Sequence, residues 1–358
     1  MASLERAREY ATVKVSRAAG ILLLAWVSAV AGAAWAASPA VPATMHAAAI
    51  DRKGGPEVLT LHEVPVPQPG ADEVLIALDT AGVGPWDIDV RERLDYWKAR
   101  NFPIVLGVDG AGTVAAVGAQ VHEFKPGDAV YAYAWNNPKG GFYAEYVALP
   151  AKVVGHVPAG MSLKDAGAMA VSALTALQGV DDALHVKAGE TLIIHGASGA
   201  VGSLAVQFAK LRGVKVLAIA SGDDGVSFVR RLGATAAVDG RHGDIRAAAR
   251  GLAPGGVDAV LAFAGGDALE ACIDALKPGG RVAFPSGVRP EPKPRPGLAL
   301  TKYDALTGPA EYERLNQAIV AAKLEVPIAA EFPLAQAAKA QERMAAGHVL
   351  GKIVLRIR

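Results

Sequence analysis

The chain has 358 residues, a length that fits about two domains; 52% of the residues are hydrophobic, 20% are charged, and the formal net charge at pH 7 is +1. This composition is that of packed globular proteins, so it excludes general disorder, and the balanced charge provides no basic surface for nucleic acid. The single cysteine, Cys272, excludes an intramolecular disulfide and any zinc site built from several cysteines.

The first 44 residues differ from the rest of the sequence. Ile21–Trp35 is an apolar run without charge, and Ala34-Trp35-Ala36 has the small-residue pattern of a signal-peptide cleavage site. If residues 1–36 are a secretory signal, the protein is exported; membrane contact is expected only if the apolar run is retained. The alternative is an overlong start before Met45. The coenzyme chemistry inferred below needs a reduced pool and favours the cytoplasm.

From Met45 to about Ser162 the sequence predicts short β-strands separated by turns rich in proline and glycine. The predicted strands are Val58–Glu63, Glu73–Ala81, Gly112–Val117, Ala129–Tyr133 and Glu145–Leu149. Short strands at this spacing are typical of a small β-barrel or sandwich.

The pattern changes at Ser162, a plausible N-cap for a long helix over Leu163–Ala183. Strands and helices then alternate. Strands are expected at Thr191–His195, Val214–Ala220, Ala236–Val238, Val257–Ala262 and Arg281–Phe284, and helices at Val201–Leu211, Gly225–Leu232 and Ala268–Leu276. This alternation predicts a doubly wound parallel sheet. The closing strand, Gly351–Ile357, is expected to return to the β-rich first half.

The most informative segment is Thr191–Gly202, which reads as a strand, a glycine-rich turn and the start of a helix. In this context Gly196 allows the tight turn, Gly199 leaves room for a diphosphate, and Gly202 lets the helix pack closely on the strand. The helix N-terminus presents N–H groups to the phosphates. The expected coenzyme-binding loop is Gly196, Ser198, Gly199, Ala200, Val201 and Gly202. A purely structural glycine turn is the alternative.

Residues near the end of the second strand of the parallel sheet, Val214–Ala220, distinguish NAD from NADP in this kind of fold. An acidic residue there favours the free 2′-hydroxyl of NAD. Here Ser221 stands at that position, and Arg241 after the next strand could supply positive charge. Asp223 and Asp224 would repel a phosphate if they pointed inward. The balance favours NADPH over NADH.

Several motifs occur in an order and spacing typical of one family. They are MHAAAIDRKGGPEVLT (45–60), AGVGPWD (81–87), GVDGAG (107–112), FKPGDAV (124–130), HGASGAVG (195–202), AFAGG (262–266), LKPGGR (276–281) and GHVLGKIVL (347–355). With these motifs the chain resembles the medium-chain dehydrogenase/reductases, in the zinc-independent quinone oxidoreductase and enoyl reductase branch.

The resemblance implies an α/β fold in which a Rossmann domain (residues 165–302) is inserted into a GroES-like β domain (residues 45–164, completed by 303–358). It also implies a homodimer. Zinc-dependent relatives have Cys where Gly84 stands and His where Val108 stands, so no metal site is expected. Zinc-free relatives usually have Asn at the Gly84 position, and an Asp is frequent where Ala262 stands.

The resemblance also suggests roles for individual residues. Tyr96 has the spacing of a proton-donating Tyr, with a half-buried loop aromatic as the alternative. Asp87 either orients its loop or faces the substrate; a structural turn role is equally open. Thr175 matches a position beside the nicotinamide amide, and Lys352 a lysine near the coenzyme or else a solvated strand residue. Phe263, Ala264 and Gly265 of AFAGG are expected at the coenzyme.

These expectations combine into one function. The sequence predicts an NADPH-dependent reductase of a quinone or an α,β-unsaturated carbonyl, acting by hydride transfer without zinc. The alternative is an NADPH-binding structural or regulatory protein without significant turnover.

Overall fold

The computed structural model describes residues 41–93 and 101–358, within a compact unit that spans Ser38–Arg358. The signal-like run Ile21–Trp35 and the predicted proton donor Tyr96 lie outside the described residues. In the part of the chain that is described, no helix combines the length and the apolar character that a bilayer span requires.

A six-stranded parallel sheet forms the centre of the coenzyme half, with the order β11-β10-β9-β12-β13-β14. Its strands are β9 (Thr191–His195), β10 (Lys215–Ala220), β11 (Ala236–Asp239), β12 (Val257–Ala262), β13 (Leu276–Pro285) and β14 (Ala299–Tyr303). This is the 3-2-1-4-5-6 order of the doubly wound dinucleotide-binding fold, with the change of winding direction between β9 and β12.

Helices cover both faces of this sheet because its central strands are apolar on both sides. Leu192 and Ile194 of β9 belong to a core with α2 and α3, whereas Ile193 belongs to a core with α5 and α6. The alternation follows the two-residue period of a strand. The helices are α2 (Leu163–Gln178), α3 (Ala200–Leu211), α4 (Gly222–Arg231), α5 (Ile245–Leu252) and α6 (Asp267–Ile273), and α2 runs on into the π-helical turn η4 (Gly179–Ala183).

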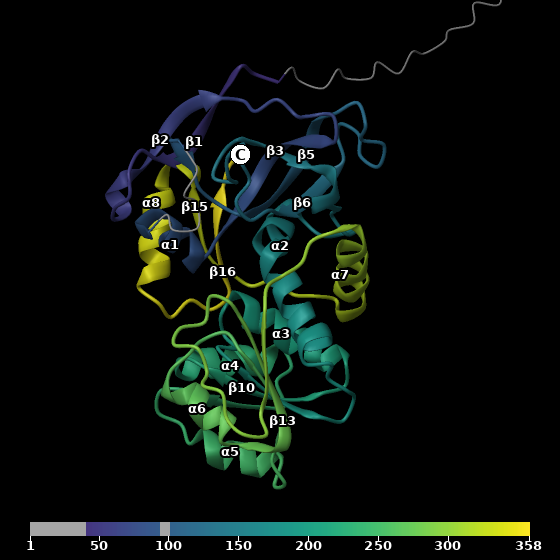
Figure 1. Cartoon of the computed structure of the whole chain (residues 1–358), viewed down its shortest axis with the longest axis vertical. Helices are drawn as coiled ribbons and strands as arrows, with labels where there is room; N and C mark the ends of the chain where they lie inside the picture. Colours follow the sequence, from purple (N-terminus) through teal and green to yellow (C-terminus); the bar gives the residue numbers. More distant parts are fainter. Residues whose placement is uncertain (1–40, 94–100) are drawn as a thin grey trace, which may run out of the picture. The chain divides into compact units, whose positions relative to one another are not determined.

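The other half is built from a seven-stranded sheet and a three-stranded sheet. Its strands are β1 (Thr44–Ile50), β2 (Leu59–Pro65), β3 (Glu73–Val83), β4 (Ile104–Val105), β5 (Asp109–Val117), β6 (Ala129–Tyr133), β7 (Tyr146–Pro150), β8 (Val154–His156), β15 (Ile328–Pro333) and β16 (Lys352–Arg356). The closing strand β16 pairs antiparallel with β3, with Ile353 opposite Val83. In Figure 1 the yellow β16 lies beside the blue β3, so the chain returns to its first half, as the sequence predicts.

Three further helices are α1 (Pro85–Arg93), α7 (Pro309–Ala322) and α8 (Ala337–Ala345), and short 3-10 turns are η1 (Pro56–Val58), η3 (Ala151–Val153) and η5 (Leu334–Gln336). The fold is therefore α/β, a Rossmann sheet inserted into a GroES-like β domain. The domain boundaries within residues 45–358 stay a prediction, because residues 38–358 form one compact unit.

Two of the differences from the sequence prediction concern the helices α6 and α1. The helix expected over Ala268–Leu276 ends at Ile273, and Leu276 instead begins β13, beside Val257 of β12. The following Pro278 and Gly279 cannot sustain a helix. Helix α1 was not expected, since its sequence PWDIDVRER has no apolar stripe of helical period.

Cys272 is completely buried on α6, as expected for a small apolar core residue. Burial raises the pKa of its thiol to about 12, so the thiol is unreactive at neutral pH.

Candidate functional site

The glycine loop between β9 and α3 has the geometry that the sequence predicts. Gly196 has a φ of +77°, a left-handed conformation that favours glycine. A Cβ on Gly202 would overlap the carbonyl oxygen of Gly196, so α3 packs directly on the loop. A Cβ on Gly199 would approach only that oxygen, at 3.6 Å, so the surface of the loop at Gly199 is open.

The first turn of α3 suits a diphosphate. Ala200, Val201 and Gly202 are its first residues, and their N–H groups have no acceptor four residues earlier in the helix. The N-cap, Gly199, contributes no side-chain cap, and the first turn contains no acidic residue. These free donors, together with the open surface at Gly199, fit the diphosphate of a dinucleotide coenzyme.

The loop after β12 lies next to this site. Ala262, at the end of β12, is in register with His195 at the end of β9, and the Phe263 N–H donates to the His195 carbonyl at 3.0 Å. A Cβ on Gly265 would overlap the backbone of Arg289 and Pro290. Phe263, Ala264 and Gly265 therefore gather with the glycine loop at the carboxyl edge of the sheet, where α/β folds bind ligands.

His195 is buried at the end of β9, and neither of its ring nitrogens has a hydrogen-bond partner among the described residues. Burial lowers the pKa of this imidazole, so it is neutral at pH 7. These features are those of a structural residue beside the glycine loop.

The tip of β10 carries a contact that the sequence did not reveal. The Ser221 hydroxyl lies 3.1 Å from Nδ1 of His348, and Nε2 of the same imidazole lies 2.9 Å from a carboxylate oxygen of Asp224. Asp224 thus faces a histidine. Arg241 is exposed, and its backbone N–H donates to Asp239 at 3.2 Å. His348 belongs to the motif GHVLGKIVL, but only the fold brings it to Ser221.

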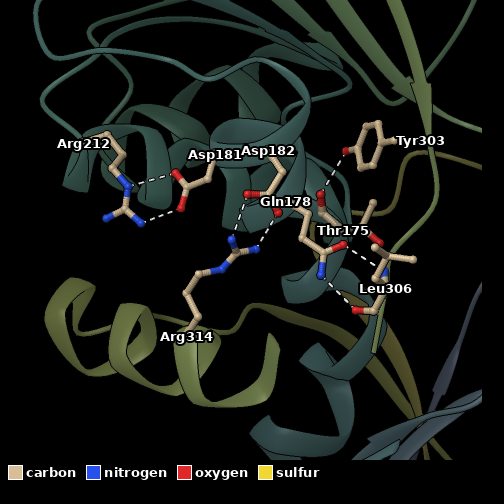
Figure 2. A network of polar contacts seen from close by, with 8 residues as sticks. All are labelled: Thr175, Gln178, Asp181, Asp182, Arg212, Tyr303, Leu306 and Arg314. Carbon is tan, nitrogen blue, oxygen red and sulfur yellow. Dashed lines mark hydrogen bonds and ion pairs between the residues drawn. The ribbon is translucent and has the colours of Figure 1, made fainter. Parts of the chain in front are cut away.

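Thr175 lies near the end of α2, where a polar network fixes the backbone. Its hydroxyl donates to the Val171 carbonyl at 2.8 Å, and its own carbonyl accepts from the Tyr303 hydroxyl at 2.9 Å. Gln178 exchanges two hydrogen bonds with the backbone of Leu306. The network is shown in Figure 2.

Two arginines complete this network. Both carboxylate oxygens of Asp181 accept from Arg212, the C-cap residue of α3, and both of Asp182 accept from Arg314 of α7 (Figure 2). These bidentate pairs tie the π-helical turn η4 to two neighbouring helices. The position of Thr175 is therefore fixed, and its contact with nicotinamide stays a prediction.

A buried ion pair joins β16 to β5 across the strand β3, which lies between them in the sheet. The Lys352 ammonium is 3.4 Å from the Asp109 carboxylate, and the two side chains are 2% and 0% exposed. A Cβ on Gly82 would lie 2.6 Å from Cε of Lys352, so only glycine leaves room for this pair. Lys352 is thus no solvated strand residue; its ammonium also lies 5.1 Å from the centroid of the Trp86 indole.

Asp87 is buried in the same region, where it holds its own turn. One of its oxygens accepts from the Gly84 N–H at 2.8 Å and from the Tyr143 hydroxyl at 3.0 Å. Burial, with a smaller contribution from nearby Asp109, raises its pKa to about 7 against the opposing effects of the Gly84 hydrogen bond and Lys352. Among the roles considered for Asp87, these contacts favour the one in which its carboxylate orients its own loop.

Comparisons with known proteins agree with this architecture. Residues 70–159 match the family model described as alcohol dehydrogenase GroES-like domain, and residues 232–355 match the model described as zinc-binding dehydrogenase. A quinone oxidoreductase of Sus scrofa is 32% identical over 311 residues, which cover 83% of this chain and 93% of that protein. The chain belongs to the medium-chain dehydrogenase/reductase superfamily, in its quinone oxidoreductase branch. It is an NAD(P)H-dependent oxidoreductase.

Solved structures give the same family. An NAD-dependent alcohol dehydrogenase is 30% identical and superposes with a TM-score of 0.81, covering 88% of this chain and 100% of that one. A mycobacterial protein solved in complex with NADPH is 29% identical, with a TM-score of 0.77 and coverage of 87% and 100%. The family thus includes relatives described with either coenzyme.

In this medium-chain oxidoreductase, an indole occupies the space beside Gly84, the position where the resemblance places a zinc ligand in zinc-dependent relatives. A Cβ on Gly84 would overlap the indole of Trp86, so a Cys or Asn there would require the indole to move. Val108 is buried. Within residues 41–93 and 101–358, no three His, Cys, Asp or Glu side chains are grouped so as to hold a metal ion.

Asp87 should make the stability of this reductase depend on pH. Its pKa is 3.8 when exposed and about 7 in the fold, so the folded state keeps a proton that the unfolded chain has released. This contribution is complete below about pH 4 and is lost as the pH rises through 7, a change of up to about 4 kcal/mol. We expect Asp87→Asn to gain stability relative to the wild type as the pH rises.

Urea unfolding at pH 5 and pH 8, followed by tryptophan fluorescence, measures this difference. Asp89→Asn, at an exposed position of the same helix, serves as the control and should show no such pH dependence. An equal effect of Asp87→Asn at both pH values would contradict the assignment.

Proposed function

We propose that the protein is a zinc-independent, NADPH-dependent reductase that transfers hydride to a quinone or an α,β-unsaturated carbonyl. The observation that carries the proposal is the open glycine loop with its uncapped helix N-terminus, in a chain that has Gly84 and Val108 where metal ligands would stand. Membership of the family indicates an oxidoreductase reaction with a nicotinamide coenzyme. The residues at positions 84 and 108 favour, within that class, a reaction without zinc.

The coenzyme, when bound, supplies the hydride. The protein's contribution is positioning: the N–H groups of Ala200, Val201 and Gly202 hold the diphosphate, and the network around Thr175 fixes the wall proposed to face the nicotinamide. Without a Lewis acid, an isolated ketone lacks charge stabilisation worth several kcal/mol, whereas a conjugated acceptor spreads the incoming charge over its own atoms. This favours quinones and enones.

The lysine beside Trp86 brings a buried ion pair to the proposed site. Lys352 lies 3.4 Å from Asp109, and burial raises the pKa of that carboxyl and of Asp87. We place Asp87 as a positioning residue, and Tyr96 as the residue that donates the proton to the reduced acceptor.

Three features support NADPH as the coenzyme. Ser221 replaces an acidic residue at the tip of β10. Asp224, the nearby carboxylate, is paired with His348. Relatives include a mycobacterial protein solved with NADPH.

A panel of acceptors tests the reaction. We expect NADPH oxidation with quinones or enones, insensitive to a chelator, and no efficient oxidation of simple primary alcohols. Alcohol oxidation without quinone or enone turnover would contradict the proposal, as would stoichiometric zinc whose removal abolishes activity. NADPH binding without turnover of any acceptor would instead support the structural or regulatory alternative. That alternative is favoured by Gly84, where zinc-free relatives usually have Asn, and by Ala262, where an Asp is frequent.

Tyr96→Phe forms a second arm of the same experiment. If Tyr96 donates the proton, enone turnover should fall by roughly 10²-fold while the dissociation constant of NADPH stays unchanged. Unchanged turnover would remove Tyr96 from the mechanism and leave solvent as the proton source.

We propose that the protein is a homodimer. The edge strand β14 pairs only with β13 within the described chain, and Leu306 beyond it is 67% exposed. An unpaired edge is a ready template for a second copy. Analytical ultracentrifugation should give twice the 36.7 kDa of the chain; a monomer at micromolar concentration would contradict the assignment.

We assign the protein to the cytoplasm, because a reductase that consumes NADPH needs a pool that is continuously reduced. N-terminal sequencing of the native protein tests this, and a mature start near Ala37 would overturn it in favour of export.

A further inference from the structure

The segment that joins α8 to β16 reaches the coenzyme loop. The Gly351 N–H donates to the Ser198 carbonyl at 3.0 Å, and Gly351 forms a parallel bridge with Gly199. A Cβ on Gly225 of α4 would lie 3.5 Å from the Leu350 side chain. Residues 347–351 are thus fixed both to the glycine loop and to the helix that follows β10.

The backbone around His348 is held in an unusual conformation. His348 has a φ of +48°, a region that side-chain-bearing residues rarely adopt. The Arg343 guanidinium donates to the carbonyls of Gly347 and His348, at 2.9 and 3.1 Å. This brace from α8 keeps the imidazole at the tip of β10.

The imidazole joins two groups with opposite effects on a phosphate. Ser221 can donate a hydrogen bond to an anion, whereas Asp224, in the first turn of α4, would repel one. His348 contacts both, at 3.1 and 2.9 Å. Its hydrogen bond holds the pKa of Asp224 below the usual value, so that carboxylate is ionised at neutral pH.

We propose that His348 determines the specificity of the coenzyme site for a 2′-phosphate, by offsetting the charge of Asp224 and orienting the hydroxyl of Ser221. The inference rests on the proposed function, in which NADPH is the coenzyme, and names the group that makes NADPH acceptable despite the acidic Asp224 in the first turn of α4. The group comes from the segment before β16, far from β10 in the sequence.

The two ring nitrogens explain why a histidine suits this position. An imidazole has a nitrogen on each side of the ring, so one side chain contacts the Asp224 carboxylate through Nε2 and the Ser221 hydroxyl through Nδ1 at the same time. The charged groups that face the imidazole or its backbone are Asp224 of α4 and Arg343 of α8. Asp239, on the neighbouring strand, is occupied by the N–H groups of Gly222 and Arg241.

A double-mutant cycle tests the proposal by direct binding, without any turnover. Dissociation constants of NADPH and NADH are measured by fluorescence at fixed salt for the wild type, His348→Ala, Asp224→Asn and the double variant. We expect His348→Ala to weaken the binding of NADPH about tenfold and the binding of NADH less than about threefold. The reason is that only NADPH brings a 2′-phosphate to the exposed Asp224 carboxylate. In the double variant, removal of the carboxylate should restore most of the NADPH affinity.

Asp223→Asn is the matched control, since Asp223 is the preceding, exposed residue of α4. Its effect should simply add to that of His348→Ala. Equal weakening of NADPH and NADH by His348→Ala, or no recovery in the double variant, would overturn the inference and indicate a merely structural histidine. A wild type that prefers NADH would contradict the NADPH assignment itself. The double-mutant cycle still measures the coupling energy between positions 224 and 348 in NADPH binding. If that coupling energy is zero, the inference is overturned, whichever coenzyme the wild type prefers.

Discussion

The buried pair of Lys352 and Asp109 is the constraint on which the arrangement of the site depends. Lys352 begins the last strand and Asp109 begins β5, and the Val171 N–H of α2 donates to the same Asp109 carboxylate at 3.3 Å. A buried charge is costly without its partner, and removing one member of such a pair typically costs about 3–5 kcal/mol. The end of the chain, the β sheet and the first helix of the coenzyme half are therefore held together at one point.

The neighbouring residues follow from this pair. Gly82 must lack a side chain so that Lys352 fits, and Trp86 lies over the ammonium while covering Gly84. The volume that a metal ligand at position 84 would need is thus taken by an indole. The same packing leaves Asp87 buried beside a second carboxyl, which explains why its pKa is raised. One of its oxygens accepts from the Gly84 N–H and from the Tyr143 hydroxyl.

The coenzyme half differs, because the N–H groups of the first turn of α3 have no acceptor within the helix and are left for a ligand. Its glycine loop packs tightly on the inside, where Gly202 meets Gly196, and remains open at Gly199. The arginine pairs of Asp181 and Asp182 stabilise the end of α2 from outside. Between the halves, Gly351 and His348 connect the last strand to the loop and to the tip of β10, so the segment that closes the β sheet also shapes the coenzyme site.

The sequence by itself determined the features that are local. Strands and helices alternate over residues 191–284, and the glycine loop lies between β9 and α3, because the spacing of apolar residues and glycines reports directly on backbone geometry. The absence of Cys and His at positions 84 and 108 could also be read from the chain. Only the tertiary structure decided the contacts between distant residues: Lys352 with Asp109 across 243 positions, and His348 with Ser221 across 127. Such pairs carry no periodic signal, since they form only when strand register and helix packing have brought the two segments together.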